Sequence, residues 1–136
     1  MSFTPFSYRA WVKRMNWKAG TLDGEGAVVD GDTAHFLADR GMHEYQAANC
    51  RFWGVNTPEL NDTDPAKRQA ALAAKTWLRQ TIEGKQVFVL SKGLDKYGRP
   101  LVIVWLSEAD FGDNVKSVNR QLIDLGYAVA YMGELL

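Results

Sequence analysis

The stretch RFWGVNTPE, residues 51–59, gathers a cation, an amide, a hydroxyl and a carboxylate within one short segment. Arg51 lies in an apolar run that predicts a strand, and the polar residues from Asn56 to Glu59 follow where that strand is expected to end. The intervening proline stiffens the turn and sets Glu59 at a fixed distance from Asn56. The stretch therefore predicts a strand that carries oxygen ligands, a cation and a potential base at its end.

Two other stretches have related chemistry, VVDGDT at residues 28–33 and DKYGR at residues 95–99. Each of the three has an ordinary structural explanation when it is taken alone. Asp-Gly-Asp is a common turn sequence, Thr-Pro-Glu is a good helix start, and Asp-Lys-Tyr-Gly-Arg fits a hairpin turn with Gly98 at positive φ. We expect Gly31 to let the chain bend so that Asp32 faces the same pocket as the other two stretches.

Length and charge limit the class of protein. A chain of 136 residues predicts a single domain, 1–136, and its 16 basic and 16 acidic residues balance. A strongly basic nucleic-acid binder would carry a net positive charge, so any polyanion must be held by a local basic cluster. His35 and His43 lack the close spacing and the cysteine partners of a zinc site. The single cysteine, Cys50, excludes an intrachain disulfide, and its strand-like surroundings predict a buried, inert thiol.

Two features bear on location. No apolar run reaches the length of a membrane span, so no membrane partner is expected. The N-terminus lacks the basic segment followed by an apolar one that marks a secretory signal. The sequence leaves open a cytoplasmic protein, a protein encoded by a phage or mobile element, and a secreted protein whose signal has been removed. The oligomeric state is open as well, with a monomer favoured.

Hydrophobic periodicity and turn residues predict the order of the elements. Strands are expected at residues 8–17, 27–29, 35–38 and 45–55, with a turn or irregular excursion at 18–26. A helix follows, because Asp64 caps Pro65 at the first helical position and Gly84 comes after the last turn. Strands at 86–90 and 101–106 enclose a loop at 91–100, and a helix near 116–125 precedes a short extended tail at 127–131. The expected apolar helix faces consist of Ala70, Ala74, Trp77, Leu78 and Ile82, and of Val118, Leu122 and Leu125.

This order predicts a fold that is mainly β with α. The expected architecture is a five-stranded OB-type barrel with a helix between strands 3 and 4 and a second helix near the C-terminus. Barrels of this type bind nucleic acid on one face, but topology alone does not determine function. The residues of the three polar stretches must therefore decide it.

Together the three stretches resemble the staphylococcal nuclease (thermonuclease-like) family. The resemblance runs from about Ala27 to Tyr131. It includes, in the family's order, VVDGDT, the run at 51–59, the intervening helix, DKYGR, and a Ser-Val-Asn helix that ends in Leu-Gly. The resemblance implies calcium-dependent cleavage of DNA and RNA at the bond to the 5′ oxygen, which leaves 3′-phosphate ends.

The resemblance also implies a role for individual residues. Asp32, Asn56 and the carbonyl of Thr57 match the calcium ligands. Arg51 and Arg99 match the two phosphate-binding arginines, Glu59 matches the general base, and Tyr97 matches a tyrosine that contacts a substrate phosphate.

The chemistry of these residue types agrees with such roles. A phosphodiester is anionic and gains charge on its oxygens as water attacks, and the planar fork of arginine fits two phosphate oxygens. A hard divalent ion prefers the oxygen ligands that Asp32, Asn56 and Thr57 offer. Lys96 adds charge beside the substrate, and Tyr97 and Tyr131 can stack on bases without reading sequence. We expect cutting without sequence specificity, a preference for single strands of DNA or RNA, and activity that falls with salt.

Two departures from the family pattern stand out. The best-known members carry aspartate where this chain has Asn56, and the amide removes a full negative charge, so calcium binds more weakly or another divalent metal is used. Several members also continue into another helix, whereas this sequence stops at Leu136. The alternative function is a non-catalytic OB-fold module that binds nucleic acid or protein. Non-cutting relatives usually lose one of the two arginines or the glutamate, whereas this chain keeps Arg51, Arg99 and Glu59. A sugar-binding OB module has no support beyond the fold.

Overall fold

The computed structural model describes residues 7–16, 21–24 and 26–131. Five strands form a closed barrel in the order β1 (Ser7–Trp11), β8 (Gln86–Leu94), β9 (Pro100–Trp105), β6 (Tyr45–Phe52) and β5 (Thr33–Asp39). Pairing of β1 with β5 closes the barrel, and β6 with β9 is its parallel pair. With the two helices described below, this arrangement confirms the predicted OB-type barrel of class mainly β with α.

Short strands extend this barrel. β4 (Val28–Asp30) pairs with β5 through a register shift between Val28 and Asp30. β2 (Arg14–Asn16) and β3 (Thr21–Asp23) form a separate hairpin, and β7 (Val55–Asn56) pairs with β10 (Val129–Ala130). The strand predicted at 8–17 is therefore divided between β1 and β2, and the excursion predicted at 18–26 contains β3. Residues 17–20 and 25 of these predictions lie outside the described part of the chain.

Helix α1 (Pro65–Ile82) follows the predicted signals closely. The Asp64 side chain accepts a hydrogen bond from the backbone N–H of Ala66 at 2.9 Å, and Gly84 has a φ of 76° just past the helix. Ala71, Ala74, Leu78 and Ile82 are its buried residues. The prediction was wrong for Ala70, which is exposed, because Ala71 lies one residue further round the helix towards the barrel.

The second helical segment begins with a 3-10 turn, η1 (Asn114–Lys116), and continues as α2 (Val118–Asp124). Leu125 was predicted on the apolar face but is 57% exposed, because α2 ends before it. The buried residue that was not predicted is Asn119. Its amide N–H groups donate to the carbonyls of Trp53 and Val102, both at 2.9 Å, and its Oδ1 accepts from Val104 N at 3.0 Å.

Two strand boundaries also differ from the prediction. The strand predicted at 45–55 is broken after Phe52, because Gly54 adopts a φ of 76° and turns the chain into β7. β8 continues to Leu94, beyond the predicted end at residue 90, because Gly93 and Leu94 still pair with β9. The second change lengthens the paired strand that leads into the Asp95–Arg99 loop.

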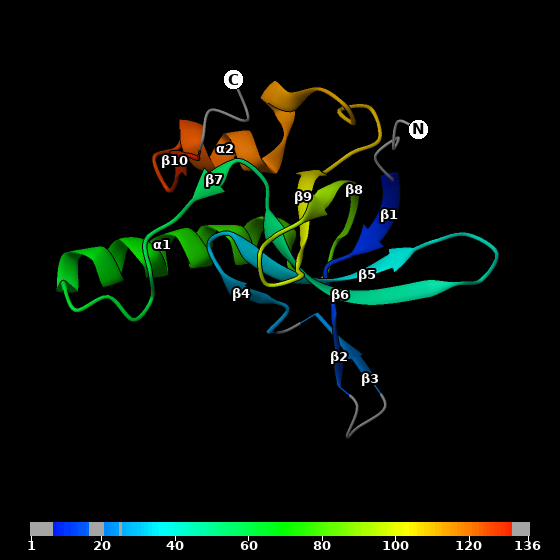
Figure 1. Cartoon of the computed structure of the whole chain (residues 1–136), viewed down its shortest axis with the longest axis horizontal. Helices are drawn as coiled ribbons and strands as arrows, with labels where there is room; N and C mark the ends of the chain where they lie inside the picture. Colours follow the sequence, from blue (N-terminus) through cyan, green and yellow to red (C-terminus); the bar gives the residue numbers. More distant parts are fainter. Residues whose placement is uncertain (1–6, 17–20, 25, 132–136) are drawn as a thin grey trace.

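The core fills the barrel and the space under the helices. Its largest fully buried side chains are Trp105, Phe52, Leu78, Ile82 and Leu122. Cys50 is buried in this core as predicted, and burial raises the pKa of its thiol to about 12. Figure 1 shows α1 and α2 on one side of the barrel, while the β5–β6 hairpin extends from the other side. No helix in the described part of the chain is both long and apolar enough to cross a membrane.

Candidate nuclease site

A cleft of about 540 Å³ opens where the ends of β6 and β10 meet the loop between β8 and β9. Every predicted site residue except Asp32 and Thr57 lines it. These lining residues are Arg51, Asn56, Glu59, Lys96, Tyr97, Arg99 and Tyr131. The topology thus brings segments that are far apart in the sequence, at 51–59, 95–101 and 131, to one concave surface.

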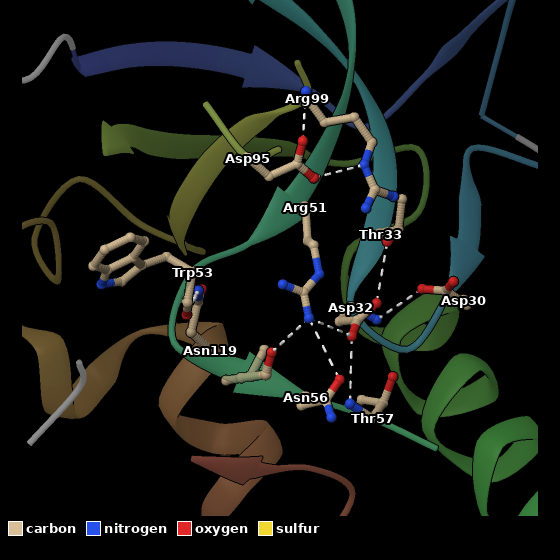
Figure 2. A network of polar contacts seen from close by, with 11 residues as sticks. Asp30, Asp32, Thr33, Arg51, Trp53, Asn56, Thr57, Asp95, Arg99 and Asn119 are labelled. Carbon is tan, nitrogen blue, oxygen red and sulfur yellow. Dashed lines mark hydrogen bonds and ion pairs between the residues drawn. The ribbon is translucent and has the colours of Figure 1, made fainter. Parts of the chain in front are cut away.

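Arg51 lies at the centre of this surface. It projects from β6, where it pairs with Thr33 of β5 on one side and Leu101 of β9 on the other. Its Nη2 donates to the carbonyl of Val55 and to Oδ1 of Asn56, both at 3.4 Å, and lies 3.7 Å from Oδ2 of Asp32 (Figure 2). These distances are longer than the 2.7–2.9 Å of a tight charge-assisted hydrogen bond. The guanidinium is therefore oriented by its neighbours without being locked to one of them.

Asp32 lies behind Arg51 and is only 7% exposed. Its Oδ2 accepts a hydrogen bond from the backbone N–H of Thr57 at 3.3 Å, and its Oδ1 accepts from the hydroxyl of Thr33 at 3.1 Å. Its carbonyl accepts from Phe52 N at 2.8 Å, which ties the turn after β4 to the strand that carries Arg51. Asp32 and Thr57 are therefore brought together, although neither lines the cleft.

Gly31 has a different role from the one predicted. Its φ is not in the left-handed region, so the bend itself does not require glycine. A Cβ at this position would lie 2.7 Å from Cβ of Ala74 and 2.9 Å from Cγ2 of Thr57. Glycine is needed because α1 and Thr57 approach the backbone closely, and this approach brings Thr57 to Asp32.

Asp30 was not among the predicted site residues, although it lies beside them. Its Oδ1 accepts the backbone N–H of Asp32 at 3.1 Å. Burial first, and then the side chain and charge of Asp32, raise the pKa of Asp30 to about 7. Near neutral pH this carboxyl therefore carries a proton much of the time. The Asp-Gly-Asp spacing was the available signal, because it places two carboxyls two residues apart.

Arg99 is held by its own loop. Asp95 accepts hydrogen bonds from the backbone N–H groups of Tyr97 at 2.8 Å and Arg99 at 2.9 Å, and from Nε of Arg99 at 2.8 Å. Desolvation opposes ionisation of Asp95, but these hydrogen bonds and the Arg99 charge together outweigh it and lower the pKa of Asp95. Tyr97 lies under two cations, with Lys96 Nζ 5.1 Å and Arg99 Cζ 5.7 Å from its ring centre.

Glu59 lies in the segment between β7 and α1 and faces solvent. It lines the same cleft as both arginines. Within the described ranges, no residue forms a hydrogen bond or ion pair with its carboxylate. A carboxylate in this position is free to accept a proton from a water molecule in the cleft.

The predicted metal ligands supply oxygen donors only. The side-chain oxygens of Asp32 and Asn56 lie 3.7 and 3.4 Å from the same atom, Nη2 of Arg51. The backbone N–H of Thr57 donates a hydrogen bond to Asp32. This chemistry fits a hard divalent cation such as calcium. Only one of the three donors is a carboxylate. No group of three or more His, Cys, Asp or Glu residues in the described ranges is placed to hold a metal ion.

The sequence model of the family described as Staphylococcal nuclease homologue matches residues 49–134. The chain belongs to this family. The match contains every predicted site residue except Asp32, which the structure places against Arg51 and Thr57 from outside the matched range. Membership in the staphylococcal nuclease homologue family makes this a nuclease-type or nucleic-acid-binding fold.

One curated protein of similar sequence is Protein ParB of Escherichia coli. The two are 29% identical over 106 residues, which cover 76% of this chain and 54% of ParB. This chain therefore spans about half the length of that relative.

Proposed function

We propose that this protein is a metal-dependent nuclease, with calcium as the preferred ion, that hydrolyses DNA and RNA phosphodiesters without strong sequence specificity and leaves 3′-phosphate ends. The observation that carries the proposal is that Arg51, Glu59 and Arg99 line one cleft. Two guanidinium groups and an unpaired carboxylate are the groups that a phosphodiester and its attacking water require.

The two arginines bind the phosphate. Each guanidinium presents a planar fork of N–H donors that matches the non-bridging oxygens, and both keep their charge at any working pH. The charge on these oxygens grows as water attacks, so the arginines bind the transition state more tightly than the substrate. An arginine in this role is worth on the order of a thousandfold or more in rate, by analogy with phosphoryl-transfer enzymes.

Glu59 acts as the general base. Its carboxylate orients the attacking water and accepts a proton from it as the new bond to phosphorus forms. The bond from phosphorus to the 5′ oxygen breaks, and the phosphate stays on the 3′ side. The exposed position of Glu59 leaves room for water and substrate between it and the arginines.

Asp32, Asn56 and the carbonyl of Thr57 would hold the metal ion. When bound, the ion neutralises charge on the phosphate oxygens. The single carboxylate of this donor set favours an ion held with modest affinity, because the charge of the ligands helps to determine how tightly calcium binds.

Exposed groups at the rim hold the rest of the substrate. Tyr97 is 72% exposed and Tyr131 45%, and Lys96 Nζ lies over the ring of Tyr97. Stacking on such rings tolerates any base but requires an unpaired one, so single strands are the preferred substrate. A monomer suffices for this mechanism, because one chain supplies all of these groups.

The test is incubation of the protein with end-labelled single-stranded DNA and calcium, with and without a chelator. Glu59→Gln and Arg99→Ala are run in parallel. The proposal expects 3′-phosphate products from the wild type, loss of cleavage with chelator, and a large loss in both variants. Cleavage that persists in the chelator and in both variants would overturn it.

One observation favours a second candidate, a module that binds nucleic acid without cutting it. Asp32 is the single carboxylate among the three proposed metal donors, so the donor set has little charge to hold a metal. Under this alternative, wild type and Glu59→Gln bind single-stranded DNA equally well, and neither cuts it with any divalent metal.

A further inference from the structure

Trp53 lines the cleft together with Arg51 but was not among the predicted site residues. Its backbone is fixed from two sides, because its N–H donates to the carbonyl of Val102 at 2.8 Å and its own carbonyl accepts from Asn119 at 2.9 Å. Figure 2 shows its indole extending away from the guanidinium of Arg51 and out of the polar network. The backbone at Trp53 is therefore fixed, and the side chain also packs against the core, next to the strand position of Arg51.

The indole of Trp53 differs from those of two other tryptophans. The N–H of Trp105 is buried and donates to the carbonyl of Asp113 at 2.7 Å, and Trp77 is stacked on Tyr127 at 5.6 Å. Trp53 is only half-buried, and within the part of the chain that the structure describes no group accepts a hydrogen bond from its indole N–H. Buried tryptophans usually satisfy this donor, so an unpaired one in a cleft is available to a ligand.

Lys92 lies over this ring, with Nζ 5.5 Å from its centre. Ser91 pairs with Val102 and Gly93 pairs with Leu101, so Lys92 has no partner on β9 and is the extra residue of a β-bulge. A bulge changes the direction in which a strand presents a side chain, and bulges are frequent beside active sites. The bulge in β8 turns an exposed cation towards Trp53 in the cleft wall.

From this arrangement we propose that Trp53 and Lys92 form a subsite for the nucleotide next to the one whose phosphate lies on Arg51 and Arg99. The inference rests on the proposed function and adds a second nucleotide position to it. The base stacks on the Trp53 indole, and Lys92 pairs with the adjoining phosphate. A cation–π contact at an exposed position is weak, so an arriving base displaces the ammonium group from the ring.

The rigidity of Trp53 distinguishes this subsite from the tyrosines of the rim. Tyr97 is 72% exposed and Tyr131 is 45% exposed, whereas Trp53 is half-buried and its side chain packs against the core. A ring that is already held in place loses less conformational freedom when a base stacks on it. Trp53 is therefore expected to contribute more to binding than either tyrosine.

The experiment measures binding separately from cleavage. A Glu59→Gln parent in chelator is titrated with single-stranded oligothymidylates, each with one abasic position, and dissociation constants are obtained by anisotropy. Stacking of one base on an aromatic residue is worth about five- to 150-fold in affinity. We expect one abasic position to weaken binding to the parent at least fivefold and to change binding by less than twofold when Trp53→Ala is added. Trp53→Phe keeps an aromatic face and restores most of the sensitivity, and circular dichroism confirms that each variant is folded.

Lys92→Gln provides an independent arm. Loss of one phosphate contact lowers the salt dependence of single-strand binding by about 0.7 in the log–log slope. Lys85→Gln is the matched control, because Lys85 is also exposed but lies at the opposite end of β8, and it should leave the slope unchanged.

The outcomes separate the two proposals. If the parent binds and no abasic position couples to Trp53, the subsite is refuted while the nuclease proposal stands. If the parent and wild type do not bind single strands at all, both proposals fail. A slope change in Lys85→Gln equal to that in Lys92→Gln would also refute the subsite, because the effect would then be one of general charge.

Discussion

The two arginines of the cleft are held in opposite ways. Arg51 touches three oxygens from two separate segments at 3.4–3.7 Å, and its Cζ lies 5.6 Å from the ring of Tyr131. Arg99 makes a 2.8 Å bond to Asp95, four residues earlier in the same turn. The first arginine depends on the tertiary structure around it, whereas the second depends on a local loop.

This difference determines what each arginine does for the protein as well as for a substrate. The partner of Arg51 is the buried carboxylate of Asp32, which would be left without a counterion if Arg51 were removed. The partner of Arg99, Asp95, also accepts short hydrogen bonds from the backbone N–H groups of Tyr97 and Arg99, at 2.8 and 2.9 Å, so its carboxylate stays partnered when the Arg99 side chain is removed. Substitutions of the two arginines should therefore lower activity by similar amounts but lower the free energy of unfolding by different amounts.

The largest expected effect is on cleavage. Arg51→Ala and Arg99→Ala should each lower kcat/KM by on the order of a thousandfold, because each removes a cation from the transition-state phosphate. Arg51→Ala should also lower the free energy of unfolding by about 1–2 kcal/mol, since a buried charged group loses a partner. Arg99→Ala should change it by no more than about 0.5 kcal/mol. Steady-state cleavage and urea unfolding measure the two quantities.

Arg68→Ala is the control for this pair of variants. Arg68 lies on the exposed face of α1, and its loss should alter neither cleavage nor stability. Equal destabilisation by Arg51→Ala and Arg99→Ala would show that the two arginines do not differ in how much the surrounding fold depends on them.

A smaller effect should come from Gly31→Ala. The added Cβ would lie within 3 Å of Ala74 and Thr57, and such overpacking typically lowers stability by about 1–3 kcal/mol. Because Thr57 must shift, the metal donors and Arg51 are disturbed, and calcium affinity falls together with stability. Calorimetry and urea unfolding measure these effects.

Gly98→Ala is the matched substitution on the Arg99 side. Nothing lies within 4 Å of its added Cβ, so the only penalty is backbone strain at a φ of 80°, about 1 kcal/mol. This substitution should leave calcium affinity unchanged. Loss of affinity in Gly98→Ala but not in Gly31→Ala would contradict the assignment of the metal donors to the Asp32 side.

Asn56→Asp tests the same difference between the two sides of the cleft, because it adds a negative charge beside Arg51 and none beside Arg99. A second carboxylate about 4 Å from a divalent ion adds roughly 2 kcal/mol even in a water-like medium, so calcium affinity should rise by an order of magnitude or more. Calorimetric titration of wild type, Asn56→Asp and Asn56→Ala tests this. Equal or weaker binding in Asn56→Asp would show that residue 56 is not a ligand.

The sequence was most informative where structure is local. Asp64, Pro65 and Gly84 predicted α1 almost to the residue, because caps and turns act over a few neighbours. The Asp95–Arg99 loop is local in the same sense, and its glycine has the positive φ that was expected. The order of the elements along the chain predicted the OB-type barrel.

What escaped prediction depends on contacts between distant segments. Asn119 interrupts an apolar helix face, and only the neighbouring carbonyls of Trp53 and Val102 explain why it is buried. The β-bulge that directs Lys92 towards Trp53 arises from the pairing of β8 with β9, and no local pattern marks it. The approach of Thr57 to Asp32 likewise requires α1 to pack against the turn at Gly31. The predicted roles of the site residues remain predictions, although most of those residues share one cleft.

The smallest expected effect comes from a substitution that removes only the contact between Asp95 and the Arg99 side chain. Asp95→Asn keeps the oxygen that accepts the backbone N–H groups of Tyr97 and Arg99. It replaces the oxygen that accepts from Arg99 Nε with an amide nitrogen, which cannot accept a hydrogen bond. The turn should persist while Arg99 becomes mobile. Because a single ion pair in a surface loop is weak, kcat/KM should fall only about two- to fivefold.

The pH dependence of this link has a defined sign. The pKa of Asp95 is lowered from its ordinary 3.8, so the link is fully present above pH 3.8 and is lost as the pH falls through the lower folded-state value. NMR of the Arg99 Nε–H should therefore show, in wild type, a protected signal at neutral pH that disappears in acid, and in Asp95→Asn, weak protection throughout. A protected signal in Asp95→Asn at neutral pH would mean that other parts of the fold hold Arg99, and that the two arginines differ less than their contacts indicate.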